Sequence, residues 1–226
     1  MFDKSSNRFF VENVSLVMSP SVFAFAEAGH RAASSAGTSN PLVLDGPRRD
    51  TASARDIAAL YASPEVLTGS LATRDRFLKS AVGRRVVHLN ADTAPNIAYP
   101  FLSRVMLADE PGRPNSGALL GRDIAATPLT DTELVVIDQR AGATHSESNG
   151  LGLSRAFIAA GVPAVLTTLP GADEVAAAEQ FVGFHREVAN GAAAVDALST
   201  LQRNAIKQNG RRVGAWFALV IYGSDR

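Results

Sequence analysis

Two polar residues that follow short apolar runs could take part in chemistry. Asp92 follows the run Val-Val-His-Leu-Asn-Ala that begins at Val86, and Arg140 follows the run Leu-Val-Val-Ile-Asp-Gln that begins at Leu134. Ligands and catalytic groups of open parallel sheets sit at the carboxyl ends of the strands. We therefore expect neighbouring strands that direct Asp92 and Arg140 into one crevice. A carboxylate beside a guanidinium there could form an ion pair, or bind and polarise a small substrate.

Other side chains near these strand ends could supply a nucleophile or a base. His145, Ser146 and Ser148 follow Arg140 in a loop, and a serine nucleophile needs a base within hydrogen-bond reach. His88 supplies such a base only if its side chain faces the crevice. A histidine inside a strand is more often a core residue, and loop serines are more often helix caps. The sequence thus leaves a serine-based site as the minor alternative.

The composition excludes several classes of protein. The chain has no cysteine, which excludes disulfides, thiolate metal sites and cysteine nucleophiles. Lys+Arg and Asp+Glu are both 22, which argues against a broadly basic nucleic-acid binder. The four histidines fall in four separate elements without ligand spacing, so we expect no metal and no cofactor.

Neither a membrane span nor a signal peptide is visible. The longest apolar run, near residue 215, is the size of a strand and well short of the roughly 18 residues of a membrane span. The N-terminus passes quickly into polar residues, unlike a signal peptide. We expect a cytoplasmic protein that contacts no membrane.

Buried strands alternate with helices along the chain, a pattern typical of α/β proteins with a mainly parallel sheet. At 226 residues the chain is long enough for one large domain. The predicted strands span 8–18, 42–44, 65–68, 85–90, 104–107, 133–138, 164–169 and 215–222. The predicted helices span 22–33, 52–61, 72–81 (entered through Thr73), 123–126, 151–160, 172–190 and 194–208.

The N-terminus has the residues of a hairpin turn at positions 3–7, with only Met1 and Phe2 before it. We interpret this as a turn that has lost its partner strand, which predicts a domain truncated at its N-terminus. In this interpretation residues 1–40 form a hairpin and helix region, and residues 41–226 form the core of a single domain.

Several motifs together resemble the CHAT domain, a caspase- and separase-like fold often found behind tetratricopeptide repeats in bacterial proteins. The family's strand Val-Val-Leu-Ser-Ala-Cys-Glu-Thr-Gly is similar to residues 135–143, and its helix Leu-Ala-Arg-Ala-Phe-Leu-Ala-Ala-Gly is similar to residues 153–161. Thr168-Leu169-Pro170 followed by Asp173 and Glu174 is like the family's strand end Ser-Leu-Trp-Pro with two acids. Phe184-His185 is like its Phe-Tyr, and residues 216–223 are like its terminal Trp-x-x-Phe strand with glycine. Each motif is weak alone, but together they are specific, and the resemblance covers nearly the whole chain.

The resemblance implies a caspase-like three-layer sandwich, with a mainly parallel central sheet of about six strands and helices on both faces. It also implies a cysteine peptidase whose histidine ends one strand, in the pattern His-x-x-x-His-Gly, and whose cysteine ends the next. His88 matches the first histidine of that pattern, whereas Asp92 occupies the catalytic histidine position and Arg140 the cysteine position. An arginine stays protonated and cannot act as the nucleophile. The resemblance therefore predicts a pseudoprotease without retained catalytic residues.

The function expected from this resemblance is a protein-binding or regulatory module of a larger bacterial protein. Its partner would be a protein or peptide, such as an adjoining repeat region, held at the former cleft. Asp173 and Glu174 would form an acidic rim for a basic peptide, or simply complement the dipole of the helix they begin. The alternative is a hydrolase with a replaced nucleophile, based on Ser146 or Asp92. The candidate cleft residues are His88, Asp138, His145, Ser146, Asp173 and Glu174.

Overall fold

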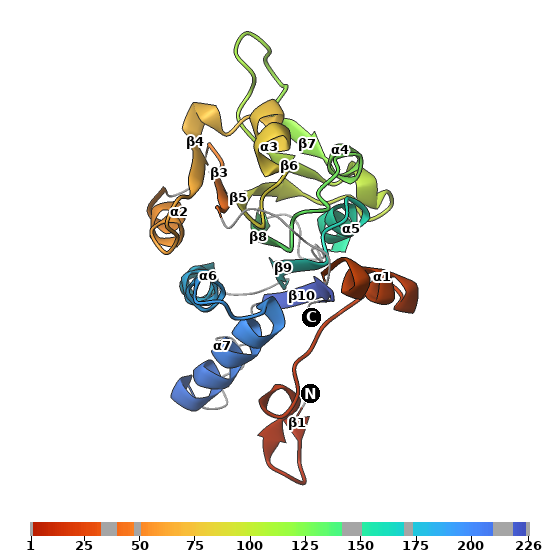
Figure 1. Ribbon diagram of the computed structural model, residues 1–226, viewed down its shortest axis with the longest axis vertical. Helices are drawn as coiled ribbons and strands as arrows, with labels where there is room; N and C mark the ends of the chain where they lie inside the picture. Colours follow the sequence, from red (N-terminus) through yellow and green to blue (C-terminus); the bar gives the residue numbers. More distant parts are fainter. Residues whose placement is uncertain are drawn as a thin grey trace.

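A central sheet lies between two layers of helices in the computed structural model, which describes residues 2–32, 40–47, 51–141, 151–169, 174–209 and 219–224 (Figure 1). The main strand order is β10-β9-β8-β5-β3-β4, and β6 and β7 are added beside the end of β5. Strands β3, β4, β5, β8 and β9 are parallel, while β10 pairs antiparallel with β9. The predicted α/β sandwich with a mainly parallel sheet is thus confirmed.

The strands of this sheet are short except for the two in its centre. β5 (Val86–Ala94) and β8 (Leu134–Ala141) are paired over eight residues, from Val86↔Leu134 to Thr93↔Ala141. The remaining strands are β3 (Leu42–Asp45), β4 (Glu65–Thr68), β6 (Arg104–Met106), β7 (Ala118–Leu120), β9 (Ala164–Thr168) and β10 (Leu219–Gly223). The centre of the sheet is therefore built from the two strands that contain Asp92 and Arg140.

Helices cover both faces of the sheet. On one face lie α2 (Thr51–Ala58), α6 (Glu174–Ala189) and α7 (Ala194–Asn209). On the other face lie α3 (Arg74–Ala81), α4 (Gly121–Ala125) and α5 (Leu151–Ala159). Helix α1 (Val22–Ala32) lies beside β10 and α5, where Arg31 Nη1 donates a hydrogen bond to the carbonyl of Ile158 at 3.1 Å.

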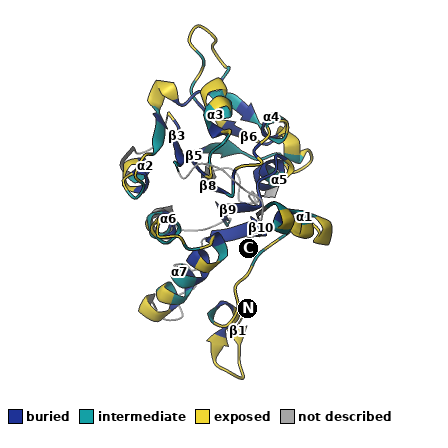
Figure 2. Ribbon diagram, viewed as in Figure 1, coloured by how far each residue is buried: buried dark blue, intermediate teal, exposed yellow. Residues whose placement is uncertain are grey.

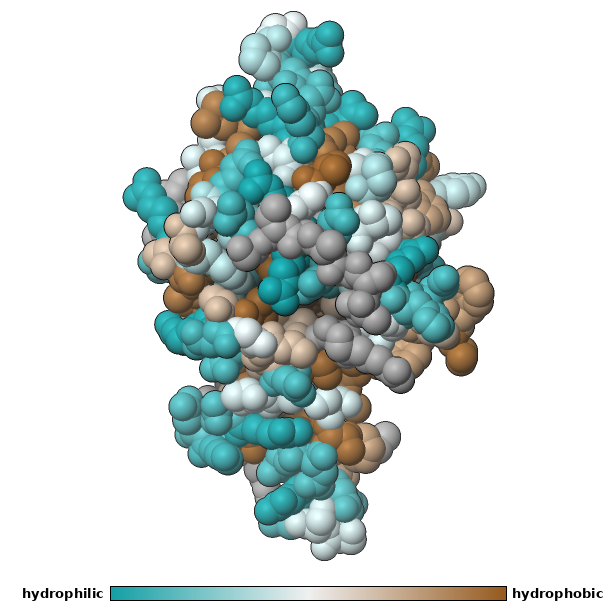
Figure 3. Space-filling model, viewed as in Figure 1, coloured by the Kyte–Doolittle hydropathy of each residue, from teal (hydrophilic) through white to brown (hydrophobic). Residues whose placement is uncertain are grey.

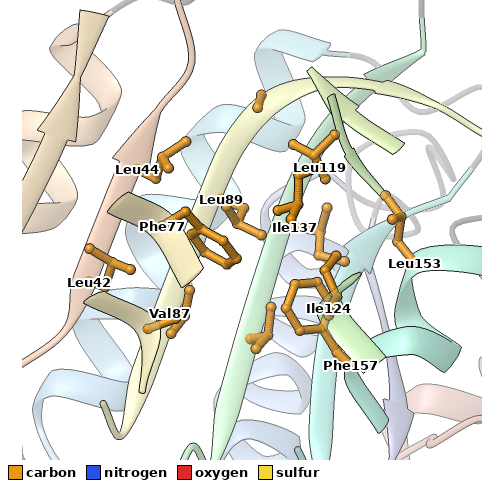
Figure 4. Close-up of a cluster of buried hydrophobic side chains, with 14 of the residues drawn as sticks. Leu42, Leu44, Phe77, Val87, Leu89, Leu119, Ile124, Ile137, Leu153 and Phe157 are labelled. Atoms are coloured by element: carbon orange, nitrogen blue, oxygen red, sulfur yellow. The ribbon is translucent and has the colours of Figure 1, made fainter. Parts of the chain in front are cut away.

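Alternation along β5 divides the core between the two layers, because successive strand side chains point to opposite faces. Val87 and Leu89 pack under α3 and α5, together with the fully buried Phe77 and Phe157 (Figure 4). Val86 packs on the other face, under α2, α6 and α7. His88 shares that face. Buried side chains follow the strands, and exposed ones the outer sides of the helices (Figure 2).

Several predicted boundaries hold and others move. Helix α3 is entered through Thr73 as predicted, with Thr73 Oγ1 accepting a hydrogen bond from Arg76 N at 3.4 Å. β5 runs on to Ala94, four residues past its predicted end, and α2 ends at Ala58, three residues before its predicted end. β7 was not predicted at all. Residues 172–173 and 215–218, at the starts of a predicted helix and strand, lie outside the described residues.

The predicted strand over residues 8–18 is wrong. β1 (Phe2–Asp3) and β2 (Arg8–Phe9) form a short antiparallel hairpin, followed by the 3-10 helix η1 (Phe10–Glu12). The helix forms because the Glu12 carboxylate reaches back and accepts a hydrogen bond from Phe9 N at 2.7 Å. The turn at 3–7 therefore has its partner strand, in Phe2 and Asp3, contrary to the interpretation that this strand is lost.

The N-terminal segment rejoins the sheet at its outer edge. Met18 N donates to the Ile221 carbonyl at 2.9 Å, and Gly223 N donates to the Met18 carbonyl at 2.8 Å. Val22 and Phe23 of α1 are 87% and 79% exposed, and hydrophobic surface is visible over this helix (Figure 3). Two further 3-10 helices, η2 (Gly69–Leu71) and η3 (Pro100–Leu102), follow β4 and precede β6.

Candidate functional site

Asp92 and Arg140 are register partners on adjacent parallel strands. Asp92 of β5 lies opposite Arg140 of β8, and Asn90 lies opposite Asp138 two residues earlier. Neighbouring strands run about 4.8 Å apart, so the two backbones are close at this level. The prediction that the two residues lie on neighbouring parallel strands is confirmed. The side chain of Arg140 lies outside the described part of the structure, and that of Asp92 is half-buried.

The sheet splits at the end of β5, and the split forms a cleft. Gly46 N, one residue past the end of β3, donates to the Asn90 carbonyl of β5 at 2.8 Å. Beyond it β6 replaces β3 as the neighbour of β5, with Asp92 opposite Met106. The cleft between the diverging strands measures about 930 Å³ and is lined by Gly46, Pro47, Gly69, Ser70, Asp92, Arg104, Met106, Leu107, Ala108, Asp109, Asn115, Gly117 and Ala118.

Two glycines permit the close backbone contacts of this cleft. A Cβ at Gly46 would lie 3.1 Å from Cβ of Ala91, and a Cβ at Gly117 would lie only 2.2 Å from the carbonyl oxygen of Leu107. Asp109 fixes the loop before Gly117, because its carboxylate accepts hydrogen bonds from Asn115 N at 3.0 Å and Gly117 N at 2.9 Å. One wall of the cleft is therefore a pre-formed loop, which extends between β6 and β7 at the top of Figure 1.

A row of buried polar side chains crosses three strands directly beneath Asp92. Asp45 of β3 pairs in register with Asn90, and Asn90 pairs with Asp138 of β8. These three side chains are 0%, 4% and 6% exposed. Asn90 Nδ2 donates to Asp45 Oδ1 at 2.7 Å, while Asn90 Oδ1 has no hydrogen-bond partner among the described residues. Asp138, a predicted cleft residue, thus lies in this buried row.

His88 lies one further row into the core, beneath α6. It is fully buried, and its Nδ1 lies 3.0 Å from Nε2 of His185. His185 Nδ1 in turn lies 2.8 Å from the hydroxyl of Tyr61. Burial lowers the pKa of His88 to about 3, so the imidazole is neutral at pH 7. His88 is not among the residues that line the described cleft, and it occupies the core position that is common for a histidine inside a strand.

The mainly parallel sheet between two layers of helices is consistent with a caspase-like α/β sandwich. The family model of the CHAT domain matches residues 1–224. This chain belongs to the CHAT domain family. No curated protein matches it. In this CHAT domain, Asp92 of β5 and Arg140 of β8 are register partners.

The structure does not describe the side chains of the remaining predicted site residues of this CHAT domain. His145, Ser146 and Asp173 lie outside the described residues. Glu174 is the first residue of α6, and its side chain is not described either. The structure therefore brings Asp92 and Asp138 near the carboxyl ends of β5 and β8 and places His88 below them.

Sequence reasoning missed several residues of this region. Asp45 could have been found, since it directly follows the predicted strand 42–44 in the way that Asp92 follows its own run. Arg104 and Met106 reach the cleft because β6 adds to the sheet, which no local pattern indicates. Nothing near His185 in the sequence indicates that it contacts His88, 97 positions earlier.

A second hollow lies at the opposite edge of the sheet, where β5 and β8 begin. It measures about 520 Å³ and includes Tyr61, Arg85 and Glu133, with Arg85 Nε donating to Glu133 Oε2 at 2.5 Å.

Within the described ranges, no three acidic or histidine side chains are arranged to hold a metal ion. No helix in the same part of the chain is long and apolar enough to cross a membrane.

Proposed function

We propose that this CHAT domain is catalytically inactive and acts as a protein-binding or regulatory module of a larger, cytoplasmic bacterial protein. Its partner would be a protein or peptide segment, such as an adjoining repeat region, bound at the cleft beside Asp92. The observation that carries the proposal is the register pair Asp92–Arg140. The resemblance assigns these residues to the positions of the catalytic histidine and cysteine, the dyad positions, and neither residue suits the peptidase reaction.

The residues at the dyad support the loss of catalysis. The peptidase reaction needs a thiolate and a base that accepts its proton. Arginine stays protonated in proteins, and the chain contains no cysteine that could replace it. His88, the histidine of β5, is fully buried, contacts His185 in the core and is not among the residues that line the cleft.

The cleft itself supports a binding role. Asp92 and Arg104 supply charges of opposite sign, and Met106 supplies an exposed apolar surface beside them. The loop 108–117 is held to α3, because Glu110 Oε1 accepts a hydrogen bond from Asp75 N at 3.0 Å. A wall that is already ordered costs less conformational entropy when a partner binds. The size of the cleft, about 930 Å³, suits a few residues of an extended segment.

Binding is tested with fluorescein-labelled peptides of basic, acidic and neutral sequence, and with the adjoining region of the native protein. Fluorescence anisotropy measures the affinity of each for the wild-type domain and for Asp92→Lys. We expect at least one of them to bind and Asp92→Lys to weaken it tenfold or more. Asp56→Lys, an exposed site on α2, is the matched control and leaves the affinity unchanged. Equal affinities for all three proteins, or no binding, would contradict the proposal.

Inactivity is tested separately with reactive probes. The wild-type domain should neither cleave unfolded casein nor react covalently with a fluorophosphonate. The double variant Arg140→Cys/Asp92→His should react with iodoacetamide at pH 7 faster than Arg140→Cys alone, because an adjacent imidazole lowers the pKa of a thiol. Equal rates would show that the two positions do not form a dyad. Fluorophosphonate labelling of a wild-type serine would instead support the hydrolase alternative.

A further inference from the structure

Three polar side chains from three elements form one hydrogen-bonded chain through the layer of α2 and α6. The Tyr61 hydroxyl, just beyond the end of α2, lies 2.8 Å from His185 Nδ1 on α6. His185 Nε2 lies 3.0 Å from His88 Nδ1 on β5. These contacts join α6 to β5, the central strand that contains Asp92.

The surroundings of the two histidines are apolar. Both imidazoles are fully buried. The ring of Phe181 packs edge-on against His88 at a centroid distance of 5.8 Å, and that of Phe184 packs against His185 at 5.9 Å. His88 Nε2 has no hydrogen-bond partner among the described residues. A positive charge placed on either ring would therefore be poorly solvated.

The chain persists while at least one of the two imidazoles is neutral, and it is broken when both are protonated. Each neutral imidazole has one nitrogen that donates and one that accepts, so the two contacts of His185 can each join a donor to an acceptor. When both rings are protonated, the N–H groups of His88 and His185 point at each other across 3.0 Å. The rings are then two like charges with centroids 5.0 Å apart.

We propose that the Tyr61–His185–His88 chain is a proton-sensitive latch, which holds α6 against β5 and which acid releases before the rest of the fold opens. This goes beyond the proposed binding function and does not depend on it. The latch lies at the centre of the α2/α6 layer, so its release loosens α6 over most of its described contacts with the sheet. Because α6 begins soon after β9 ends, release of α6 also changes the structure beside the carboxyl end of β9.

Few charged groups face the pair from the surrounding elements. Tyr61 faces it from the end of α2. Asp45 of β3 and Asp138 of β8 lie one register row toward the cleft, beside Asn90 of β5. Along α2, α6 and α7, the charged side chains of Arg55, Asp56, Arg186 and Asp196 are exposed and that of Glu187 is half-buried. Arg85, just before β5, interacts electrostatically with Tyr61. The carboxylates are thus separated from the imidazoles by a row of the sheet.

The direction of the pH effect follows from the burial of the pair. Burial lowers the pKa of His88, and burial together with the neighbouring His88 lowers the pKa of His185. Both pKa values rise toward about 6.5 when α6 opens and the rings meet water. The closed latch is therefore favoured above pH 6.5. Below that value, each histidine raises the opening equilibrium constant of α6 roughly tenfold for every unit that the pH falls.

Hydrogen–deuterium exchange of α6 at pH 7.0 and 5.5 tests the latch, after correction for the intrinsic exchange rates. We expect the opening equilibrium of α6 to rise tenfold or more at pH 5.5, while α5 on the opposite face changes less than threefold. His185→Phe leaves His88 as the one buried histidine of the latch, so the pH dependence of α6 should fall to the roughly tenfold change that a single histidine contributes. The control His30→Gln changes an exposed histidine on α1 and should preserve that dependence. Equal protection of α6 at both pH values in the wild type would overturn the proposal.

A second measurement covers the case in which His185→Phe does not fold. The ¹⁵N chemical shifts of the imidazoles in the wild-type domain report the protonation of each ring. We expect both rings to stay neutral from pH 7 until α6 exchanges rapidly. Titration of either buried ring near pH 6.5 with α6 still protected would also overturn the latch.

Discussion

Asn90 Nδ2 donates a hydrogen bond to Asp45 Oδ1 at 2.7 Å, inside the sheet and beneath the cleft. Both side chains are almost fully buried. A carboxylate that accepts such a bond in the core depends on its donors, because a buried charge without them is strongly disfavoured. This bond joins β3 to β5 in the last register row before the two strands separate.

We predict that Asn90→Ala lowers the free energy of unfolding by about 1.5 to 3 kcal/mol, the usual value of a hydrogen bond to a charged group. Urea denaturation at pH 7 measures the change. Asn204→Ala, at an exposed position of α7, should change the stability by less than about 0.5 kcal/mol. If both variants are equally stable, the Asn90–Asp45 bond contributes nothing to the fold.

The pKa values of His88 and His185 predict that stability falls in mild acid. Both folded-state values lie below the unfolded value of about 6.5, so the unfolded chain binds more protons. The two histidines stabilise the fold fully above pH 6.5, and this contribution is lost as the pH falls. We expect the free energy of unfolding to drop by about 2 to 3 kcal/mol between pH 7.5 and 5.5.

Denaturant titrations at pH 7.5, 6.5 and 5.5 follow this loss. Most carboxylates titrate below pH 5, so they contribute little in this interval. A constant stability from pH 7.5 to 5.5 would show that the pair is not held neutral in the folded state.

Gly117→Ala should disturb the β6–β7 side of the cleft. The added Cβ would lie 2.2 Å from the backbone oxygen of Leu107, which cannot move without breaking the 2.8 Å hydrogen bond from Leu107 N to the Gly117 carbonyl. We expect a loss of about 3 kcal/mol in thermal or chemical denaturation.

Gly69→Ala, on another wall of the same cleft, provides the comparison. A Cβ there has open space, but the residue has a φ of +56°, so the cost is limited to about 1 kcal/mol of backbone strain. If Gly117→Ala proved more stable than Gly69→Ala, the close backbone contact at Gly117 would not constrain the structure.

A buried and an exposed phenylalanine should respond differently to truncation to alanine. Phe157 of α5 is fully buried against the sheet, so Phe157→Ala leaves a cavity and should cost about 3 to 5 kcal/mol. Phe23 of α1 is 79% exposed, and Phe23→Ala should change stability by less than about 0.5 kcal/mol. Guanidinium denaturation compares them, and similar losses would contradict the placement of α1 on the surface.

Local patterns were sufficient for the parallel core and for the most informative positions of the site. The runs before Asp92 and Arg140 are short and apolar, and strands buried on both faces have this composition wherever they lie in the fold. The cap at Thr73 is local too, since its bond to Arg76 N spans three residues. The prediction failed at residues 8–18, where the Glu12 side chain closes a turn that competes with an extended strand.

The sequence by itself determined that the chain contains no cysteine and therefore no cysteine nucleophile, because residue identity needs no fold. Only the tertiary structure decided that His88 faces His185, that Asp45 joins Asn90, and that β6 lies beside Asp92. The reason is physical. Each of these relationships depends on the packing of segments that are distant in the sequence, and the energy of such packing has no local signature.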